Sequence, residues 1–136
     1  MPPAARPPSA AFVHAAPEVF PRPPEAWPRA IRRSVDYIEA RLCEPLRVQQ
    51  LADAACMSRF HFSRTFRACT GQSPMEYLRR RRIGRAKELL GDGGRKVCQV
   101  ASELCFFDQS HFVRSFRRLT GLTPTRFAAQ HFDAPH

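Results

Sequence analysis

The stretch FSRTFRACTGQSPMEY at residues 62–77 returns further along the chain as FVRSFRRLTGLTPTRF at residues 112–127. At this offset of 50, the identical pairs are Phe62/Phe112, Arg64/Arg114, Phe66/Phe116, Arg67/Arg117, Thr70/Thr120, Gly71/Gly121 and Pro74/Pro124. Upstream the offset is 49, because Ala52 pairs with Ala101 and Cys56 with Cys105. The chain therefore contains an internal repeat, and its second copy holds one extra residue between Cys105 and Phe112.

Each copy carries the signals that end one helix and start the next. In the first copy Gly71 suits a left-handed helix end, the Ser73 hydroxyl suits an N-cap, and Pro74 suits a first helical turn. The second copy repeats them at Gly121, Thr123 and Pro124. Each copy is therefore predicted to be a short helix, a tight turn and a second helix, followed by a stop and a new helix.

This order is that of the helix-turn-helix, whose second helix, the recognition helix, lies in the DNA major groove. We expect the two recognition helices at about residues 58–69 and 108–119. A different interpretation is that the copies are helical hairpins that only pack together and leave their charges in solvent. The basic charge, the repeat and the turn residues together favour DNA binding.

The rest of the chain also follows a helical pattern. Ile31, Val35, Ile38 and Leu42 recur at the spacing of one apolar helix face, and no strand-like alternation interrupts the chain. We predict an all-α fold of about seven helices, in which a long connector helix at residues 74–91 joins two helix-turn-helix subdomains, 29–73 and 92–132. Its length, about 25 Å, would hold the recognition helices near the roughly 34 Å spacing of successive major grooves.

Residues 1–28 differ in composition, since they hold nine of the 13 prolines. Proline resists both helix and sheet, so this segment is expected to be a disordered leader. It is electrically neutral, with two Arg and two Glu, although the whole chain carries a net charge of +10. The excess positive charge therefore lies in residues 29–136, which points to a polyanionic partner, nucleic acid before membrane surface.

The five cysteines form no CxxC pair, and the sequence has neither a secretory signal nor an apolar run long enough to cross a bilayer. Reduced thiols in a cytoplasm are expected, with the cysteines acting as small apolar core residues. We expect no cofactor and no membrane partner.

The segments LADAACMSRFHFSRTFRACTGQSPMEYLRRRRIGRAKELL (51–90) and VASELCFFDQSHFVRSFRRLTGLTPTRF (100–127) resemble the DNA-binding domain of the AraC/XylS family. The resemblance covers about residues 29–130. It implies a bacterial regulator in the cytoplasm and nucleoid, usually an activator, that binds an asymmetric promoter site and, as in many members of the family, contacts RNA polymerase. Residues 1–28 are too few for the effector-binding domain of many members, so the chain would be a stand-alone member or a fragment.

Carried over residue by residue, the resemblance also implies DNA contacts. Arginine bonds guanine, glutamine reads adenine, and Phe or Val meets the thymine methyl group, whereas other arginines hold phosphates. The implied base contacts are Phe60, Ser63 and Arg64 in the first copy and Gln109, Ser110, Val113 and Arg114 in the second. The implied phosphate contacts are Arg59, Arg67 and Arg117. His61 and His111 are interpreted as packing or backbone contacts.

Three features depart from the family pattern. Cys56 and Cys105 stand where each turn usually has glycine, and a side chain at positive φ costs roughly 1 kcal/mol or more. Arg47 and Lys96 replace a capping Ser or Thr, which removes an N-cap. Phe107 replaces a small polar residue beside the second recognition helix.

Other functions are less consistent with the residues. A repair enzyme with a zinc-held, methyl-accepting cysteine would need clustered Cys ligands, and these five are scattered, so we predict no enzymatic activity. A zinc or redox role for Cys56 and Cys105, an acidic protein partner for the arginines at 79–82 and Arg85, and a non-specific nucleic-acid coat remain as alternatives. The run at 79–82 is more simply interpreted as a solvated face.

Overall fold

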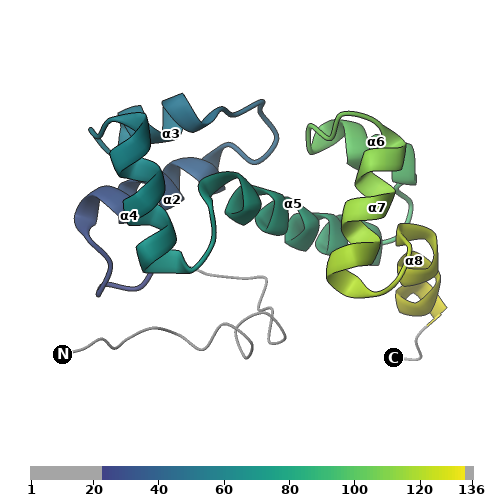
Figure 1. The fold of residues 1–136 in the computed structure, drawn as a ribbon. Coiled ribbons are helices and arrows are strands. Elements are labelled where there is room, and N and C mark those ends of the chain that lie inside the picture. Colours follow the sequence, from purple (N-terminus) through teal and green to yellow (C-terminus); the bar gives the residue numbers. More distant parts are fainter. Residues whose placement is uncertain (1–22, 134–136) are drawn as a thin grey trace. The chain divides into compact units, whose positions relative to one another are not determined.

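The computed structural model describes residues 23–133, which form seven helices and no strand (Figure 1). The helices are α2 (Arg29–Ala40), α3 (Val48–Ala54), α4 (Arg59–Thr70), α5 (Pro74–Gly91), α6 (Val97–Glu103), α7 (Gln109–Thr120) and α8 (Pro124–Asp133). The predicted all-α fold and its helix number are confirmed. The recognition helices α4 and α7 begin and end one residue later than expected.

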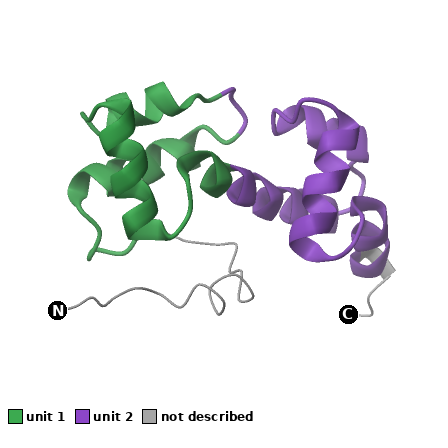
Figure 2. Cartoon of the chain, in the orientation of Figure 1, with its two compact units in different colours: residues 1–42, 46–78 green, residues 43–45, 79–136 purple. Residues whose placement is uncertain are grey.

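The chain divides into two compact units, coloured separately in Figure 2. Of the described residues, the first unit comprises 23–42 together with 46–78, and the second comprises 43–45 together with 79–133. Helices α2, α3 and α4 belong to the first unit and α6, α7 and α8 to the second, while α5 starts in the first and continues into the second. Each unit has its own apolar core.

The core of the first unit is built on aromatic side chains. Phe62 and Phe66 of α4 are fully buried, with ring centroids 5.5 Å apart, and Tyr77 meets Phe66 edge-on at 5.4 Å. The predicted face of α2 packs here through Ile31, Val35 and Ile38, all at 0% exposure. Burial of each large apolar side chain contributes about 1.5–3 kcal/mol, so these rings fix how α4 packs on its neighbours.

The second unit repeats this arrangement. The rings of Phe112 and Phe116 lie 5.7 Å apart, and Phe127 meets Phe116 edge-on at 5.4 Å. Phe127 pairs with Tyr77 at the repeat offset of 50. The sequence repeat is therefore a repeat of core packing.

The helix ends follow the predicted chemistry in both copies. Gly71 and Gly121 take left-handed φ values of 81° and 84°, and each N–H bonds a carbonyl four residues earlier at 2.8 Å. The Ser73 hydroxyl accepts the Glu76 N–H at 3.2 Å, and the Thr123 hydroxyl accepts the Arg126 N–H at 3.2 Å. Each recognition helix thus stops and the next helix starts within four residues.

The long helix α5 packs through apolar residues along its length: Tyr77, Leu78, Ala86, Leu89 and Leu90 are buried. The arginine run at residues 79–82 of this helix differs from its interpretation as a solvated face. Residues 79–81 are half-buried and Arg82 is buried, so the run is not a solvated face.

The reason is a hydrogen bond inside the second unit. Arg82 Nη2 donates to the Glu44 carbonyl at 2.6 Å and ties the loop at residues 43–45 to α5. Burial desolvates the guanidinium and lowers the pKa of Arg82.

Two further expectations need correction. The cysteines are not all core residues: Cys43, Cys56 and Cys98 are exposed and Cys105 is half-buried, whereas the half-buried Cys69 packs against the first core. Of the leader predicted over residues 1–28, residues 1–22 lie outside the described part of the chain. The last part of the leader is packed rather than disordered, since Pro23 is buried and Trp27 packs on the first core.

Candidate nucleic-acid interface

The turns between α3 and α4 and between α6 and α7 have one backbone design. Cys56 and Cys105 have φ values of 58° and 62°, and they are the non-glycine residues with positive φ among the described residues. The next residue closes each turn: the Met57 N–H bonds the Ala52 carbonyl at 3.0 Å, and the Phe106 N–H bonds that of Ala101 at 3.1 Å. The strain predicted from the missing glycines is therefore present in both turns.

Each recognition helix begins at a side-chain cap. The Ser58 hydroxyl accepts the His61 N–H at 3.2 Å, and the Asp108 carboxylate accepts the His111 N–H at 2.7 Å. Asp108 additionally places a negative charge at the positive end of the α7 dipole. These caps fix the first turn of each helix, from which the side chains predicted to face DNA bases extend.

The helices α3 and α6 lack such a cap, as predicted, since neither Arg47 nor Lys96 caps with its side chain. A glutamine in the first turn of each of these helices compensates for the missing cap, which was not predicted from the sequence. The Gln50 side chain accepts the Arg47 N–H at 2.8 Å, and the Gln99 side chain accepts that of Lys96 at 3.1 Å. Each helix thus keeps the return half of a capping box.

In α4 the buried phenylalanines leave the opposite face to solvent. Phe60 is 75% exposed, Arg64 is exposed and Ser63 is half-buried. The arginines assigned to phosphate in this helix, Arg59 and Arg67, are exposed too. All these side chains are accessible to a partner of the first unit.

In α7 the predicted side chains are accessible in the same way. Gln109, Ser110, Arg114 and Arg117 are exposed, and Val113 is half-buried. Arg64 and Arg114, which pair in the repeat, both lie two residues after a buried phenylalanine. Each unit therefore presents one exposed arginine at the same position of its recognition helix.

A hollow of about 480 Å³ lies between the beginnings of α3 and α4. Its lining consists of Arg47, Val48, Gln49, Arg59, Phe60 and Ser63. The Arg59 guanidinium lies 5.6 Å from the Phe60 ring centroid, so a cation and an aromatic face occupy one wall. The hollow brings together three predicted site residues and adds Gln49 beside them.

The two histidines differ. The His111 ring lies 5.6 Å from that of Phe106, so its predicted packing role is confirmed. His61 is exposed and contributes its backbone N–H to the Ser58 cap.

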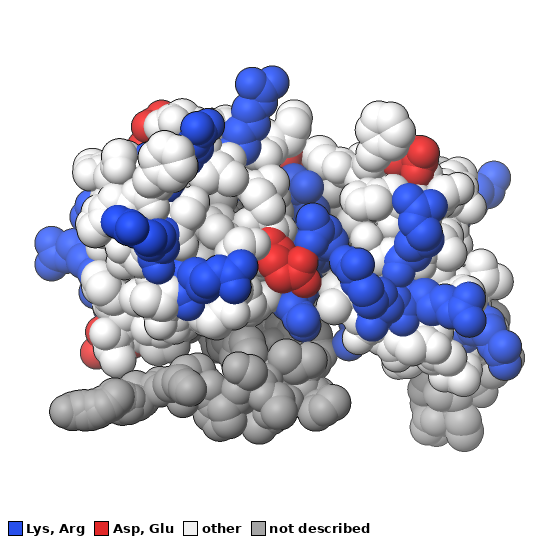
Figure 3. Space-filling model, viewed as in Figure 1, with Lys and Arg blue, Asp and Glu red and all other residues white. Residues whose placement is uncertain are grey.

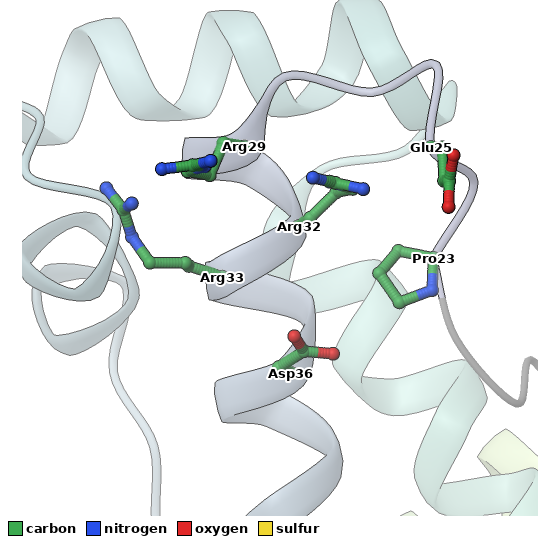
Figure 4. Close-up of a pocket in the computed structure, with 6 residues that line it drawn as sticks. All are labelled: Pro23, Glu25, Arg29, Arg32, Arg33 and Asp36. Atoms are coloured by element: carbon green, nitrogen blue, oxygen red, sulfur yellow. The ribbon is translucent and has the colours of Figure 1, made fainter.

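Basic side chains are spread over the viewed face of each unit, and acidic ones are few there (Figure 3). A second hollow, of about 400 Å³, lies beside α2 (Figure 4). Arg32 extends towards the segment with Glu25, whereas Arg33 reaches the other way and donates to the Ala54 carbonyl at 3.4 Å. Because Glu25 and Asp36 share this hollow with three arginines, its charge is largely offset, and we assign it no DNA contact.

Phe107 is the residue of this surface that the sequence analysis noted but left out of the site. It is 90% exposed and directly precedes the Asp108 cap. Within residues 23–133, no cluster of three or more His, Cys, Asp or Glu could hold a metal ion, and no helix combines the length and apolar character needed to cross a bilayer.

Comparison with known proteins gives the family. A family model described as a helix-turn-helix domain matches residues 51–130. The probable transcriptional regulator LumQ of Photobacterium leiognathi is 35% identical over 92 residues, 68% of this chain and 37% of that protein. The bifunctional transcriptional activator/DNA repair enzyme AdaA of Bacillus subtilis is 30% identical over 92 residues, 68% of this chain and 44% of that protein.

Among solved structures, the DNA-binding domain of AdpA, a global transcriptional factor crystallised with a target DNA, is 31% identical with a TM-score of 0.71. The likeness covers 75% of this chain and 92% of that domain. The chain belongs to the family of AraC-type helix-turn-helix domains. It spans less than half the length of LumQ and of AdaA, at 37% and 44%.

Proposed function

We propose that this chain is the DNA-binding part of a transcription regulator, in which each helix-turn-helix unit reads one segment of the major groove. The observation that carries the proposal is the matched pair of capped recognition helices, α4 and α7, each with an exposed arginine at the same position, Arg64 and Arg114. A net charge of +10 supplies the attraction to phosphate that such reading requires.

The roles of individual residues follow from their chemistry and accessibility. Arg64 and Arg114 bond guanine, Gln109 bonds adenine, and Phe60 contacts a thymine methyl group, with Ser63, Ser110 and Val113 beside them. Arg59, Arg67 and Arg117 hold phosphates and set the position of each helix without selecting a sequence. Residues 29–73 and 92–132 are then the two reading subdomains, joined through 74–91, on an asymmetric site that spans two successive grooves.

The test is selection of binding sites from random duplex DNA, followed by titration of the best site by fluorescence anisotropy at several salt concentrations. We expect two short sub-motifs and binding at least about a thousandfold tighter than to scrambled DNA. Equal affinity for all sequences, with a steep salt dependence, would instead identify a non-specific coat.

Variants separate the two kinds of contact. Arg64→Ala and Arg114→Ala should each relax the base preference in one sub-motif and leave the other sub-motif unchanged. Each loss of discrimination against the wrong base should be about 1–3 kcal/mol. Arg67→Ala should weaken binding to all DNA sequences alike, and should lower the slope of log affinity against log salt concentration by about one. Arg85→Ala is the matched control, because it removes one exposed arginine, paired with Glu88 on α5, outside both recognition helices.

We infer that the regulator is an activator, the role printed in the name of AdaA. We further propose, from the family resemblance, that it contacts RNA polymerase in the bacterial nucleoid. Transcription from a promoter that carries the selected site, with purified polymerase, checks this: added protein should raise the transcript yield. The repair activity in the name of AdaA is not carried over to this chain.

A further inference from the structure

The extra residue of the second repeat copy can be assigned. Cys56 and Cys105 match in φ, and the turn-closing hydrogen bonds pair Met57 with Phe106. Downstream, the caps pair Ser58 with Asp108. The inserted residue is therefore Phe107, which lies after the completed turn and before the recognition helix begins.

Phe107 has no packing role in its own unit. Its neighbour Phe106 takes that role, with its ring 5.0 Å from Phe112 and 5.6 Å from His111. Phe107 remains 90% exposed, and a ring of this size in water forgoes burial worth about 1.5–3 kcal/mol. The insertion thus adds an apolar side chain that the fold itself does not use.

A second aromatic ring occupies the same end of the other recognition helix. Phe60 and Phe107 are the exposed large apolar side chains of the described residues, at 75% and 90%. They are not equivalent in the repeat, because the partner of Phe60 is Ser110. The second copy therefore lacks an aromatic ring at position 110 and has gained one three residues earlier.

From this juxtaposition we propose that Phe107 is a specificity-determining residue of the second unit, whose ring contacts a thymine methyl group at one edge of the segment read by α7. The inference rests on the proposed function. Gln109, Ser110 and Arg114 follow it on the exposed face, and such polar and basic neighbours suit a nucleic-acid groove better than an apolar protein surface. In the first unit Phe60 makes the corresponding contact.

The experiment compares the wild-type chain with Phe107→Ala and Phe60→Ala in site selection and titration. Phe107→Ala should lose the preference for thymine at one position of the second sub-motif only, and bind the best site about tenfold more weakly, the loss expected for one large apolar contact. Phe60→Ala should do the same in the first sub-motif. Affinity for scrambled DNA and the salt slope should not change.

A change in the DNA tests the contact itself. Deoxyuridine in place of the thymine removes only the methyl group and should weaken wild-type binding about fourfold. It should have no effect on Phe107→Ala, because the ring that meets the methyl group is gone. Because Phe107 is exposed, its variant should melt at the wild-type temperature, so that lost folding cannot explain lost binding.

Two outcomes overturn the inference while the proposed function stands. In one, the wild type selects two sub-motifs and Phe107→Ala selects the same ones with equal affinity. In the other, Phe107→Ala binds DNA normally but fails to activate transcription with purified polymerase, which assigns the ring to a protein contact. If the wild type itself selects no sub-motif, the proposed function fails, and the inference with it.

Discussion

Replacing the strained turn cysteines by glycine should stabilise the protein. A left-handed backbone costs a residue with a Cβ roughly 1–2 kcal/mol, and Cys56 and Cys105 have φ values of 58° and 62°. Glycine removes that cost but makes the unfolded chain more flexible, which costs about 0.4–1 kcal/mol. The net gain for Cys56→Gly is therefore about 0.5–1 kcal/mol, or a rise in melting temperature of about 2–4 °C.

The matched control is Cys56→Ala, which removes the thiol but keeps the Cβ and its strain. Because Cys56 is exposed, this variant should melt with the wild type, so that the gain of Cys56→Gly is assigned to φ alone. Cys105→Gly should gain less, because Cys105 is half-buried and glycine also gives up its packing. Thermal unfolding followed by circular dichroism under reducing conditions measures all three. The reasoning is refuted if Cys56→Gly melts no higher than Cys56→Ala.

Further substitutions test other parts of the fold. Gly71→Ala should lower the free energy of unfolding by about 1 kcal/mol through its φ of 81° alone, since nothing lies within 4 Å of the added Cβ. Urea unfolding measures this loss, and an unchanged stability would contradict the strain argument. Arg82→Met should lower the free energy of unfolding by about 1–3 kcal/mol, because the Glu44 carbonyl loses its donor. The control Arg85→Ala should lower it by about 0.5 kcal/mol or less. Equal losses for the two variants in urea unfolding would disprove the structural role of Arg82. Asp108→Ala should lower the free energy of unfolding by about 1 kcal/mol, because it removes the α7 cap. Asp108→Asn should lower it by less, because the amide oxygen still accepts the hydrogen bond. If the two variants melt at the same temperature, the effect belongs to the charge rather than to the hydrogen bond. Burial raises the pKa of the Cys69 thiol, so a smaller fraction of it is thiolate at pH 8. Iodoacetamide should therefore modify Cys69 more slowly than the exposed Cys98. Mass spectrometry of digested samples measures both rates, and the reverse order would show that Cys69 is accessible.

The helices and their ends were predictable from the sequence because they depend on near neighbours. The spacing of Ile31, Val35 and Ile38 defines an apolar face of α2, and Gly71 with Ser73 marks a stop and a start four residues or fewer apart. Such signals need no knowledge of distant residues. The same holds for the strain at Cys56, which the repeat and the family resemblance predict from residue types alone.

The errors arose where a distant partner decides the environment. Arg82 looks like one more member of a charged run, and only the approach of the Glu44 carbonyl, 38 residues earlier, makes it a buried donor. The cysteines looked like core residues by type, yet Cys56 is exposed because its left-handed backbone serves the turn. The Gln50 cap is a different case, because Gln50 and Arg47 are only three residues apart and the sequence alone could have indicated their hydrogen bond.

In the candidate site, the sequence alone could not identify the inserted residue of the second repeat copy. The two repeat offsets restrict the inserted residue only to the interval between Cys105 and Phe112, and within it several residues could be the extra one. Hydrogen bonds decide the matter, because the turn closes at Phe106 and the cap is at Asp108, which leaves Phe107 between them. An insertion that left the turn or cap incomplete would have cost stability in the second unit. One at this position costs the fold little and changes the surface that a DNA groove would meet, so variation between related regulators should be tolerated here.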